Sequence, residues 1–224
     1  MKNHSEQIQR IKRKLLRAKE VDVDFRVFGA ASHKYEINPP ATIEDVEAFE
    51  KKYKVQLPDC YRAFILHIGN GGKSYMNSAA GPYYGIYTLG EHLDQMTSGD
   101  PESFLKNESP LHPDLSDEDW TKMCKILDDD DAPDEIYYQE LERIFAGIMP
   151  LGFQGCTYLQ GLVLNGPHKG KVINLERVAE LKPKFTYENN FLDWYERWLD
   201  EVLSGKLISN SPAWFGYGPA ESKL

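Results

Sequence analysis

The segment between residues 55 and 72 constrains the fold more than any other part of this chain, because it specifies a short helix and both of its ends. Pro58 suits a first helical position, where its missing N–H would have no partner in any case. Apolar residues at helical spacing then form one face, which needs a partner surface; they are Tyr61, Phe64, Ile65 and Ile68. Gly and Asn fill positions 69–72, tolerate left-handed backbone, and predict a tight path beside the helix. Nothing in the segment resembles a nucleophile with its base or a metal cage, so the pattern is architectural.

Two further segments carry helical patterns with clear caps. The stretch 42–53 begins at Thr42, which can accept a hydrogen bond from the backbone near Asp45, and its acidic first turn suits the helix dipole. The stretch 190–203 has a wide apolar stripe that predicts a helix anchored in the core; the stripe is Phe191, Leu192, Tyr195, Trp198, Leu199, Val202 and Leu203. Its charged residues are expected to face solvent; they are Glu196, Arg197, Asp200 and Glu201.

Short stretches rich in branched and aromatic residues predict β-strands. Residues 158–165 and 171–175 are separated by a Gly-Pro-His-Lys-Gly turn, so we expect these two strands to pair antiparallel. A further strand is expected from Ile148 onwards. Residues 83–89 also predict a strand. Residues 21–38 are expected to be extended or irregular, and Val and Phe alternate from Val21 to Val27 as in a half-buried strand.

Together these features resemble the SUKH superfamily, which includes the Smi/Knr cell-wall regulators of fungi and many bacterial toxin-immunity proteins. The resemblance rests on the acidic amphipathic helix, on Leu-Pro-x-x-Tyr-Arg-x-Phe-Ile at 57–65, and on Asn-Gly-Gly at 70–72. It extends to the paired strands and the closing helix, and covers roughly residues 37–204 with a gap in the middle. It implies a domain that binds other proteins, although its members bind different partners.

We therefore predict an α+β fold, with one mixed or mostly antiparallel sheet and helices packed against it. A basic helix and an extended segment occupy residues 1–36, and the SUKH-like domain spans 37–210. Residues 91–145 are predicted to be an acidic helical insertion, although a long, partly mobile excursion is an open alternative. The aromatic tail, 211–224, is expected to pack onto the domain, because an exposed Trp-Phe pair would be an association hazard.

Charge is distributed very unevenly along the chain. Residues 1–20 hold seven Lys or Arg and two Glu, a net of +5, whereas residues 91–145 hold seventeen Asp or Glu and four Lys or Arg, a net of −13. The acidic field repels nucleic acid and attracts a basic protein. The basic helix has three aliphatic positions on one face, too few for a membrane anchor, so we expect it to dock on its own acidic body; these positions are Ile8, Ile11 and Leu15.

The densest acidic cluster is the candidate partner-binding site; it consists of Asp128, Asp129, Asp130, Asp131, Asp134 and Glu135. A solvated acidic loop is the simplest interpretation, and it is compatible with a surface that meets a basic partner. Its oxygen ligands would suit Ca²⁺, but the spacing of an EF-hand loop is absent. The region of the glycine turn is the alternative binding surface, and the sequence does not choose between them.

The sequence contains few residue patterns that would support catalysis or the binding of a cofactor. The histidines show no metal-ligand spacing with one another or with cysteine. His67 is expected to be half-buried, and no local motif identifies Cys156 as a nucleophile. Three widely spaced cysteines favour reduced thiols in the cytoplasm, and no apolar run suits a bilayer or a signal peptide. We expect no enzyme activity, no cofactor, no obligatory small molecule, no membrane association and no nucleic-acid partner.

Three functional hypotheses remain. The first is a cytoplasmic immunity protein that neutralises a basic toxin, with a nuclease domain of a secreted toxin as the best fit, because a protein that grips phosphates carries positive charge. The second is a regulatory scaffold of the Smi/Knr type that binds endogenous proteins. The third is an enzyme whose site is assembled from distant residues, which would require a deep pocket holding Cys156 or a histidine beside a carboxylate.

Overall fold

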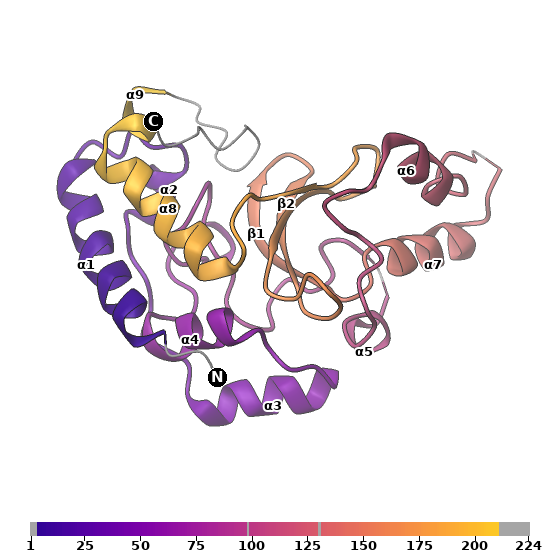
Figure 1. The fold of residues 1–224 in the computed structure, drawn as a ribbon, viewed down its shortest axis with the longest axis horizontal. Helices are drawn as coiled ribbons and strands as arrows, with labels where there is room; N and C mark the ends of the chain where they lie inside the picture. Colours follow the sequence, from indigo (N-terminus) through magenta and orange to yellow (C-terminus); the bar gives the residue numbers. More distant parts are fainter. Residues whose placement is uncertain (1–3, 98, 130, 211–224) are drawn as a thin grey trace.

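The computed structural model describes residues 4–97, 99–129 and 131–210 (Figure 1). In these residues the helices are α1 (Ser5–Val21), α2 (Ala30–His33), α3 (Ile43–Tyr53), α4 (Asp59–His67), η1 (Tyr75–Asn77), α5 (Pro101–Phe104), α6 (Asp117–Met123), α7 (Asp134–Ile144), α8 (Phe191–Leu203) and α9 (Lys206–Ser209). The strands are β1 (Ile148–Gly155), β2 (Tyr158–Val163), β3 (Val172–Glu176) and β4 (Lys184–Phe185). They form one antiparallel sheet in the order β1-β2-β3-β4. The predicted α+β fold is therefore confirmed.

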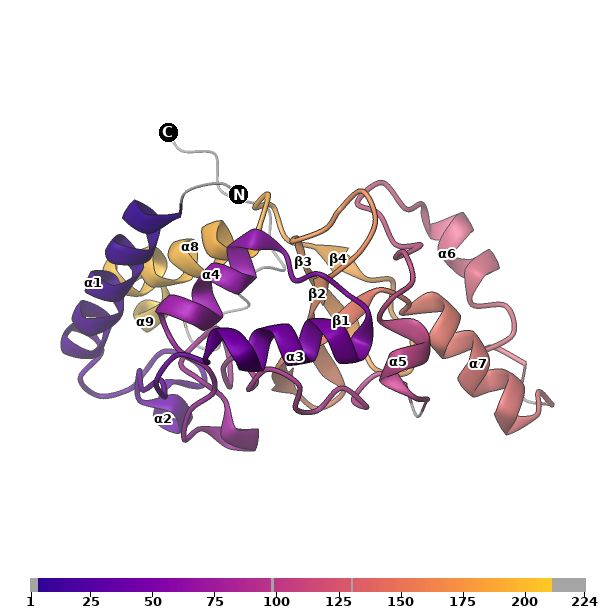
Figure 2. The ribbon, with the colours of Figure 1, turned by 90° about the horizontal axis from the view of Figure 1, so that it is seen from below.

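The sheet separates two apolar cores, one on each face. Side chains such as Leu162 and Val172 belong to the first core, which they share with α1, α3, α4 and α8. Their neighbours along the same strands, such as Leu159 and Ile173, belong to the second core, which they share with α6 and α7. Successive strand residues point to opposite faces, so burial on both faces explains why every residue of β3 is buried. Figures 1 and 2 show the helices of the two cores on opposite sides of the sheet.

The segment 91–145 is a packed part of the fold. It supplies most of the second core through buried side chains that are spaced along α6, α7 and the connecting segments; they are Met96, Leu111, Leu115, Trp120, Cys124, Leu141, Ile144 and Phe145. Ser116 caps α6 as predicted, because its Oγ accepts a hydrogen bond from the backbone N–H of Asp119 at 3.0 Å. The described residues of this segment are therefore helical and packed, and its being an insertion in the domain stays a prediction.

The signature segment forms α4 as predicted, one residue later than expected. Pro58 is the N-cap, and Tyr61, Phe64 and Ile65 are buried. The rings of Tyr61 and Phe64 lie against rings of α8. The glycine run then passes between two other segments, because the N–H of Asn38 bonds to the carbonyl of Gly71 at 2.9 Å and the N–H of Gly72 bonds to that of Asn77 at 2.8 Å. The predicted tight path is present.

Gly69→Ala tests how tight this path is. A Cβ at position 69 would lie 2.0 Å from Cγ2 of Ile37 and 2.4 Å from the carbonyl oxygen of Asn38. The backbone oxygen cannot move aside alone, so we expect the free energy of unfolding to fall by about 1–3 kcal/mol. Chemical denaturation of the variant measures this loss. Lys73→Ala, an exposed change in the same segment, is expected to stay within about 0.5 kcal/mol of the parent, and equal stability of the two variants would contradict the tight path.

The basic helix α1 docks on α8, so the expectation that it packs on its own acidic body is confirmed. Ile8 and Ile11 are buried in the seam, and the two helices run parallel. Glu196 is the centre of the polar contact, because its carboxylate accepts hydrogen bonds from Arg10 and from Lys14, each at 2.9 Å. Burial raises the pKa of Glu196, but these hydrogen bonds outweigh it and the net pKa is lowered. The expectation that Glu196 faces solvent is therefore wrong. Helix α1 covers its carboxylate and supplies Arg10 and Lys14 as hydrogen-bond partners.

The strand predicted at 83–89 is wrong, and the segment 21–38 follows the irregular alternative, not the extended one. Between Val21 and α2 the chain turns, because the Asp22 carboxylate accepts from the backbone N–H groups of Arg26 at 2.7 Å and Val27 at 3.2 Å, which favours a turn over an extended chain. Residues 83–89 run beside β1, where the N–H of Tyr87 donates to the carbonyl of Leu151 at 2.9 Å. They form no strand, and their isolated bridge joins Ile86 to Ala79. Positive φ values at Tyr83 and Gly85 interrupt the ladder there.

The three-part division of the chain at residues 36 and 210 stays a prediction. The aromatic tail, 211–224, lies outside the described residues. Within the described residues, no helix is long and apolar enough to cross a membrane.

Candidate functional site

The acidic lobe, which we define as residues 116–144, consists of α6, α7 and the loop that joins them. Its inner side is apolar, with Trp120, Leu141 and Ile144 buried in the second core. Its outer side carries the acidic residues that the sequence analysis selected. Figure 1 shows α6 and α7 at one end of the long axis, remote from α1 and α8. The packing of the apolar side therefore presents the carboxylates to solvent on a folded support.

Five of the six predicted partner-binding residues are described, and all five are exposed; they are Asp128, Asp129, Asp131, Asp134 and Glu135. Asp130 lies outside the described residues. The loop is organised locally, because Oδ1 of Asp129 accepts a hydrogen bond from the N–H of Asp131 at 3.1 Å. In the described part of the chain none of the five forms an ion pair. Their role in partner binding stays a prediction.

Two of the three cations of the lobe are paired with other carboxylates. Lys122 lies 2.7 Å from Glu118, and Arg143 lies 2.5 Å from Glu140. The nearby carboxylates also affect Cys124. Burial raises the pKa of its thiol, and the charges of Asp128 and Glu140 raise it further, to about 12. Among the lobe's three cations only Lys125 has no ion pair in the described structure, so the cluster keeps most of its negative charge.

The lobe offers no assembled metal cage in the residues that the structure describes. There, no group of three or more His, Cys, Asp or Glu side chains is arranged to hold an ion. The Ca²⁺ alternative consequently gains no geometric support from the described carboxylates, and we assign no ion to the lobe.

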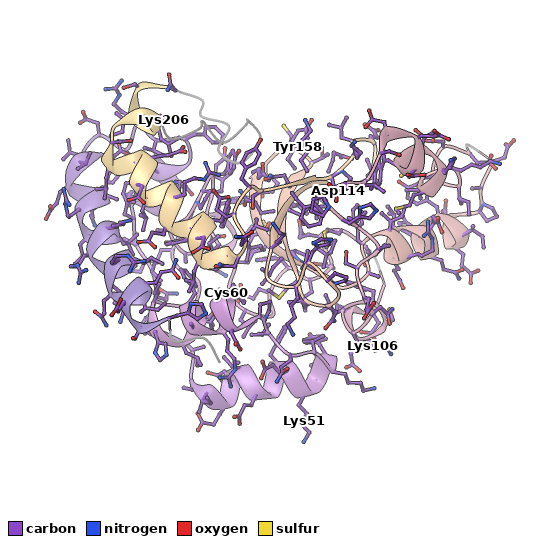
Figure 3. All side chains as sticks on the ribbon, viewed as in Figure 1. Lys51, Cys60, Lys106, Asp114, Tyr158 and Lys206 are labelled. Atoms are coloured by element: carbon purple, nitrogen blue, oxygen red, sulfur yellow. The ribbon has the colours of Figure 1, made fainter. Side chains whose placement is uncertain are left out.

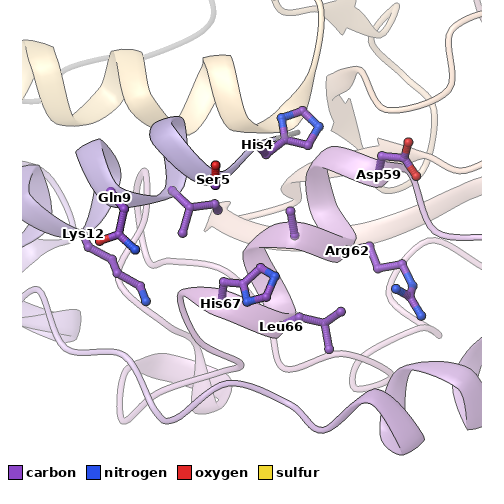
Figure 4. A pocket seen from close by; sticks show the side chains of 10 residues that line it. His4, Ser5, Gln9, Lys12, Asp59, Arg62, Leu66 and His67 are labelled. Atoms are coloured by element: carbon purple, nitrogen blue, oxygen red, sulfur yellow. The ribbon is translucent and has the colours of Figure 1, made fainter. Parts of the chain in front are cut away.

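A second surface feature is a groove of about 390 Å³ between α1 and α4 (Figure 4). The groove borders the glycine turn, because His67 lines the groove and is the last residue of α4, just before that turn. Its apolar floor contains Ile8, Ala63 and Leu66, and Lys12 and Arg62 lie on its two sides. The sequence analysis missed this groove, since it joins two helices that are far apart in the chain. His67, expected to be half-buried, is exposed on its wall.

The groove does not meet the condition that would revive the enzyme hypothesis. It contains His4, His67 and Asp59, but no hydrogen bond or ion pair joins either histidine to Asp59 in the described structure. Figure 4 shows His67 and Asp59 on different turns of α4, pointing apart. A general base needs an orienting partner within hydrogen-bond reach. The side chains of the groove therefore supply charge and apolar area without an assembled catalytic pair.

The cysteines are likewise not arranged for nucleophilic chemistry. Cys60 and Cys124 are buried, and Cys156 is exposed at the turn between β1 and β2. Burial raises the pKa of the Cys60 thiol, so both buried thiols are protonated at neutral pH. No hydrogen bond joins Cys156 to a histidine among the described residues.

A buried polar cluster beneath α8 was also missed by the sequence analysis. The hydroxyl of Tyr35 donates to Oδ2 of Asp22 at 2.7 Å, and Nδ1 of His33 accepts from the N–H of Tyr35 at 3.0 Å. Trp198 covers both rings, with its ring centroid 6.0 Å from Tyr35 and 5.8 Å from His33. This cluster has no opening to solvent at His33, which is 2% exposed, so it belongs to the core.

The geometry defines a class of protein: an α+β domain in which helices cover both faces of an antiparallel sheet and a folded acidic lobe lies at one end. This chain belongs to the SMI1 / KNR4 family (SUKH-1), which matches residues 40–197. Members of this family are generally non-enzymatic. No match was found among curated proteins or among solved structures. The matched region begins after α2 and ends inside α8, so it includes α4, the lobe and the sheet but not α1.

Proposed function

We propose that this chain is a non-catalytic protein-binding domain whose acidic lobe meets a basic partner, and that it acts as an immunity protein. The observation that carries the proposal is the row of five exposed carboxylates without ion pairs in the described structure. Opposite charge speeds diffusional encounter and fixes the relative orientation of two proteins. Membership of the SUKH family supports a protein partner.

The partner of this proposal is a toxin domain with nuclease activity. An enzyme that grips phosphates carries Lys and Arg around its active site, and an acidic surface that covers this region blocks nucleic acid from entering. The inhibitor needs no catalytic residues for this task. The protein acts in the cytoplasm in this proposal, where its thiols remain reduced.

Affinity capture from a lysate of the source organism tests this function. Wild type is expected to retain one basic partner at low salt and to release it at high salt, because exposed charges are screened. A lobe variant is expected to retain much less; it carries Asp128→Asn, Asp129→Asn, Asp131→Asn and Asp134→Asn. The matched control removes four other exposed carboxylates and is expected to behave as wild type; it carries Glu20→Gln, Glu44→Gln, Glu47→Gln and Asp94→Asn.

The identity of the captured protein decides between the functional hypotheses. A single basic protein with nuclease activity, inhibited by the wild-type chain, would support immunity. Several endogenous proteins, each held weakly, would favour the regulatory scaffold. Equal capture by the lobe variant and the wild type would remove the lobe from the interface.

A further inference from the structure

The end of the molecule opposite the acidic lobe is basic. Arg10 and Lys14 of α1 are engaged with α8, but Lys12, Arg13 and Arg17 are exposed and form no ion pair in the described structure. Lys12 stands at the side of the groove between α1 and α4, opposite Arg62, which lies 3.6 Å from Glu50. Asp59 lines the same groove, so its positive charge comes mainly from α1. We call this surface, α1 with the groove, the basic end.

Both ends also expose apolar side chains next to their charges. Leu16, one turn after Lys12 on the same side of α1, is 71% exposed, and the floor of the groove contains Leu66. In the acidic lobe Ile136 is 42% exposed and Tyr138 is 45% exposed. Ile136 directly follows the acidic first turn of α7. The two ends therefore complement each other in charge and can each bury apolar area.

The two ends of one chain cannot meet, because they lie at opposite ends of the long axis with the sheet between them (Figures 1 and 2). Only the lobe of another molecule can reach the basic end. We propose that the acidic lobe of one copy docks on the basic end of a second copy, with the first turn of α7 and Ile136 entering the groove between α1 and α4.

This contact joins two different surfaces of the same protein, so it does not close on itself. Each added copy presents a new free lobe and a new free basic end, and a row of copies grows with concentration. The net charge of −9 opposes this association. At about 0.1 M salt, however, the screening length is about 10 Å, so the charges that face each other at the contact dominate over the rest of the molecule. The lobe cannot engage a basic partner and a second copy at once, so the two compete.

Sedimentation of the purified chain tests the proposal without any other protein, and therefore independently of the proposed function. At about 0.1 M salt the average mass is expected to rise with concentration above the 25.7 kDa of one chain, and at about 1 M salt it is expected to stay at that value. A mass of one chain at every concentration at about 0.1 M salt would overturn the proposal.

Two charge-reversed variants identify the surfaces. The basic-end variant carries Lys12→Glu, Arg13→Glu and Arg17→Glu. The lobe-reversed variant carries Asp128→Lys, Asp129→Lys, Asp131→Lys, Asp134→Lys and Glu135→Lys, because fewer reversals would not make the lobe net positive. Each variant alone has two ends of like charge and is expected to remain a single chain. An equimolar mixture is expected to associate again, because every end then finds an opposite end on the other variant.

The controls separate this result from unfolding or from a change of net charge. A matched variant carries Lys51→Glu, Lys73→Glu and Lys106→Glu, three exposed cations elsewhere, and is expected to associate as wild type. Figure 3 shows Lys51 and Lys106 away from α1. Each variant is first compared with wild type by thermal melting. Association of either reversed variant alone, or a mixture of the two folded variants that stays at the mass of one chain, would overturn the proposal.

Discussion

Trp198→Ala is expected to lower the free energy of unfolding by about 3–5 kcal/mol, as is typical when a large aromatic side chain is removed from a core. Trp198 is 1% exposed and lies where α8 meets the buried cluster of His33 and Tyr35. Its ring centroid is also 5.4 Å from that of Tyr195 on the same helix. The substitution would leave a cavity between α8 and residues 22–35. We therefore expect the loss in the free energy of unfolding to lie near the upper end of this range. Denaturant titration at neutral pH measures it.

Tyr138→Ala is the control for the loss of a large ring. Tyr138 is 45% exposed on α7, so its truncation removes little buried area. The change is expected to stay within about 0.5 kcal/mol of the parent. A Trp198→Ala variant that melts with the parent would show that α8 is not anchored as described.

The stability of the protein is expected to fall as the pH drops from about 6.5 to about 4, because of His33. Burial lowers the pKa of His33 to about 4, although the nearby charge of Asp22 acts in the opposite direction. In the unfolded chain this imidazole takes up a proton near pH 6.5, whereas in the folded chain it stays neutral. The unfolded state therefore binds more protons within this window, and stability is lost as pH falls and is fully present above it.

The expected slope is about 1.4 kcal/mol per pH unit in the middle of the window. Free energies of unfolding at a series of pH values measure it, and the slope of His33→Gln is compared with the slope of the parent. The variant is expected to lose the dependence between about pH 6.5 and pH 5, whatever its absolute stability. Carboxylates such as Glu196, whose pKa is lowered, contribute only at more acidic pH. Parallel curves for parent and variant would exclude His33 as the cause.

The sequence predicted those elements whose periodicity and caps agree with their burial. The apolar faces of α4 and α8, the cap of α3 at Thr42 and the antiparallel pair β2 and β3 are local patterns, and each is present. The capping box of Thr42 and Asp45 forms in full, with both reciprocal hydrogen bonds. These patterns were sufficient for the fold class and for the family.

The predictions that failed depend on contacts between distant segments. The alternation after Val21 is overridden by Asp22, whose carboxylate also binds the hydroxyl of Tyr35. Glu196 reads as a surface residue of an amphipathic helix, yet α1 covers it. The groove between α1 and α4 exists only because these two helices are brought together through the same core. No local pattern contains that information.

For the candidate site, too, the local features could be predicted from the sequence and the features that depend on distant contacts could not. The sequence identified the acidic cluster from composition alone, and the exposure of its five described members agrees with the expected solvated loop. It could not predict that the lobe is held on the sheet by a core of its own. This feature comes from the packing of α6 and α7 against strands that follow them in the chain.

The role of the acidic lobe in binding is tested most directly by the association rate constant of the captured partner, measured over a range of salt concentrations. For wild type the rate is expected to be raised by about 10-fold or more at low salt and to fall steeply as salt rises. The four-residue lobe variant is expected to start from a lower rate and to converge with wild type at high salt, whereas the matched control follows wild type. Equal rates for wild type and the lobe variant at every salt concentration would contradict the account.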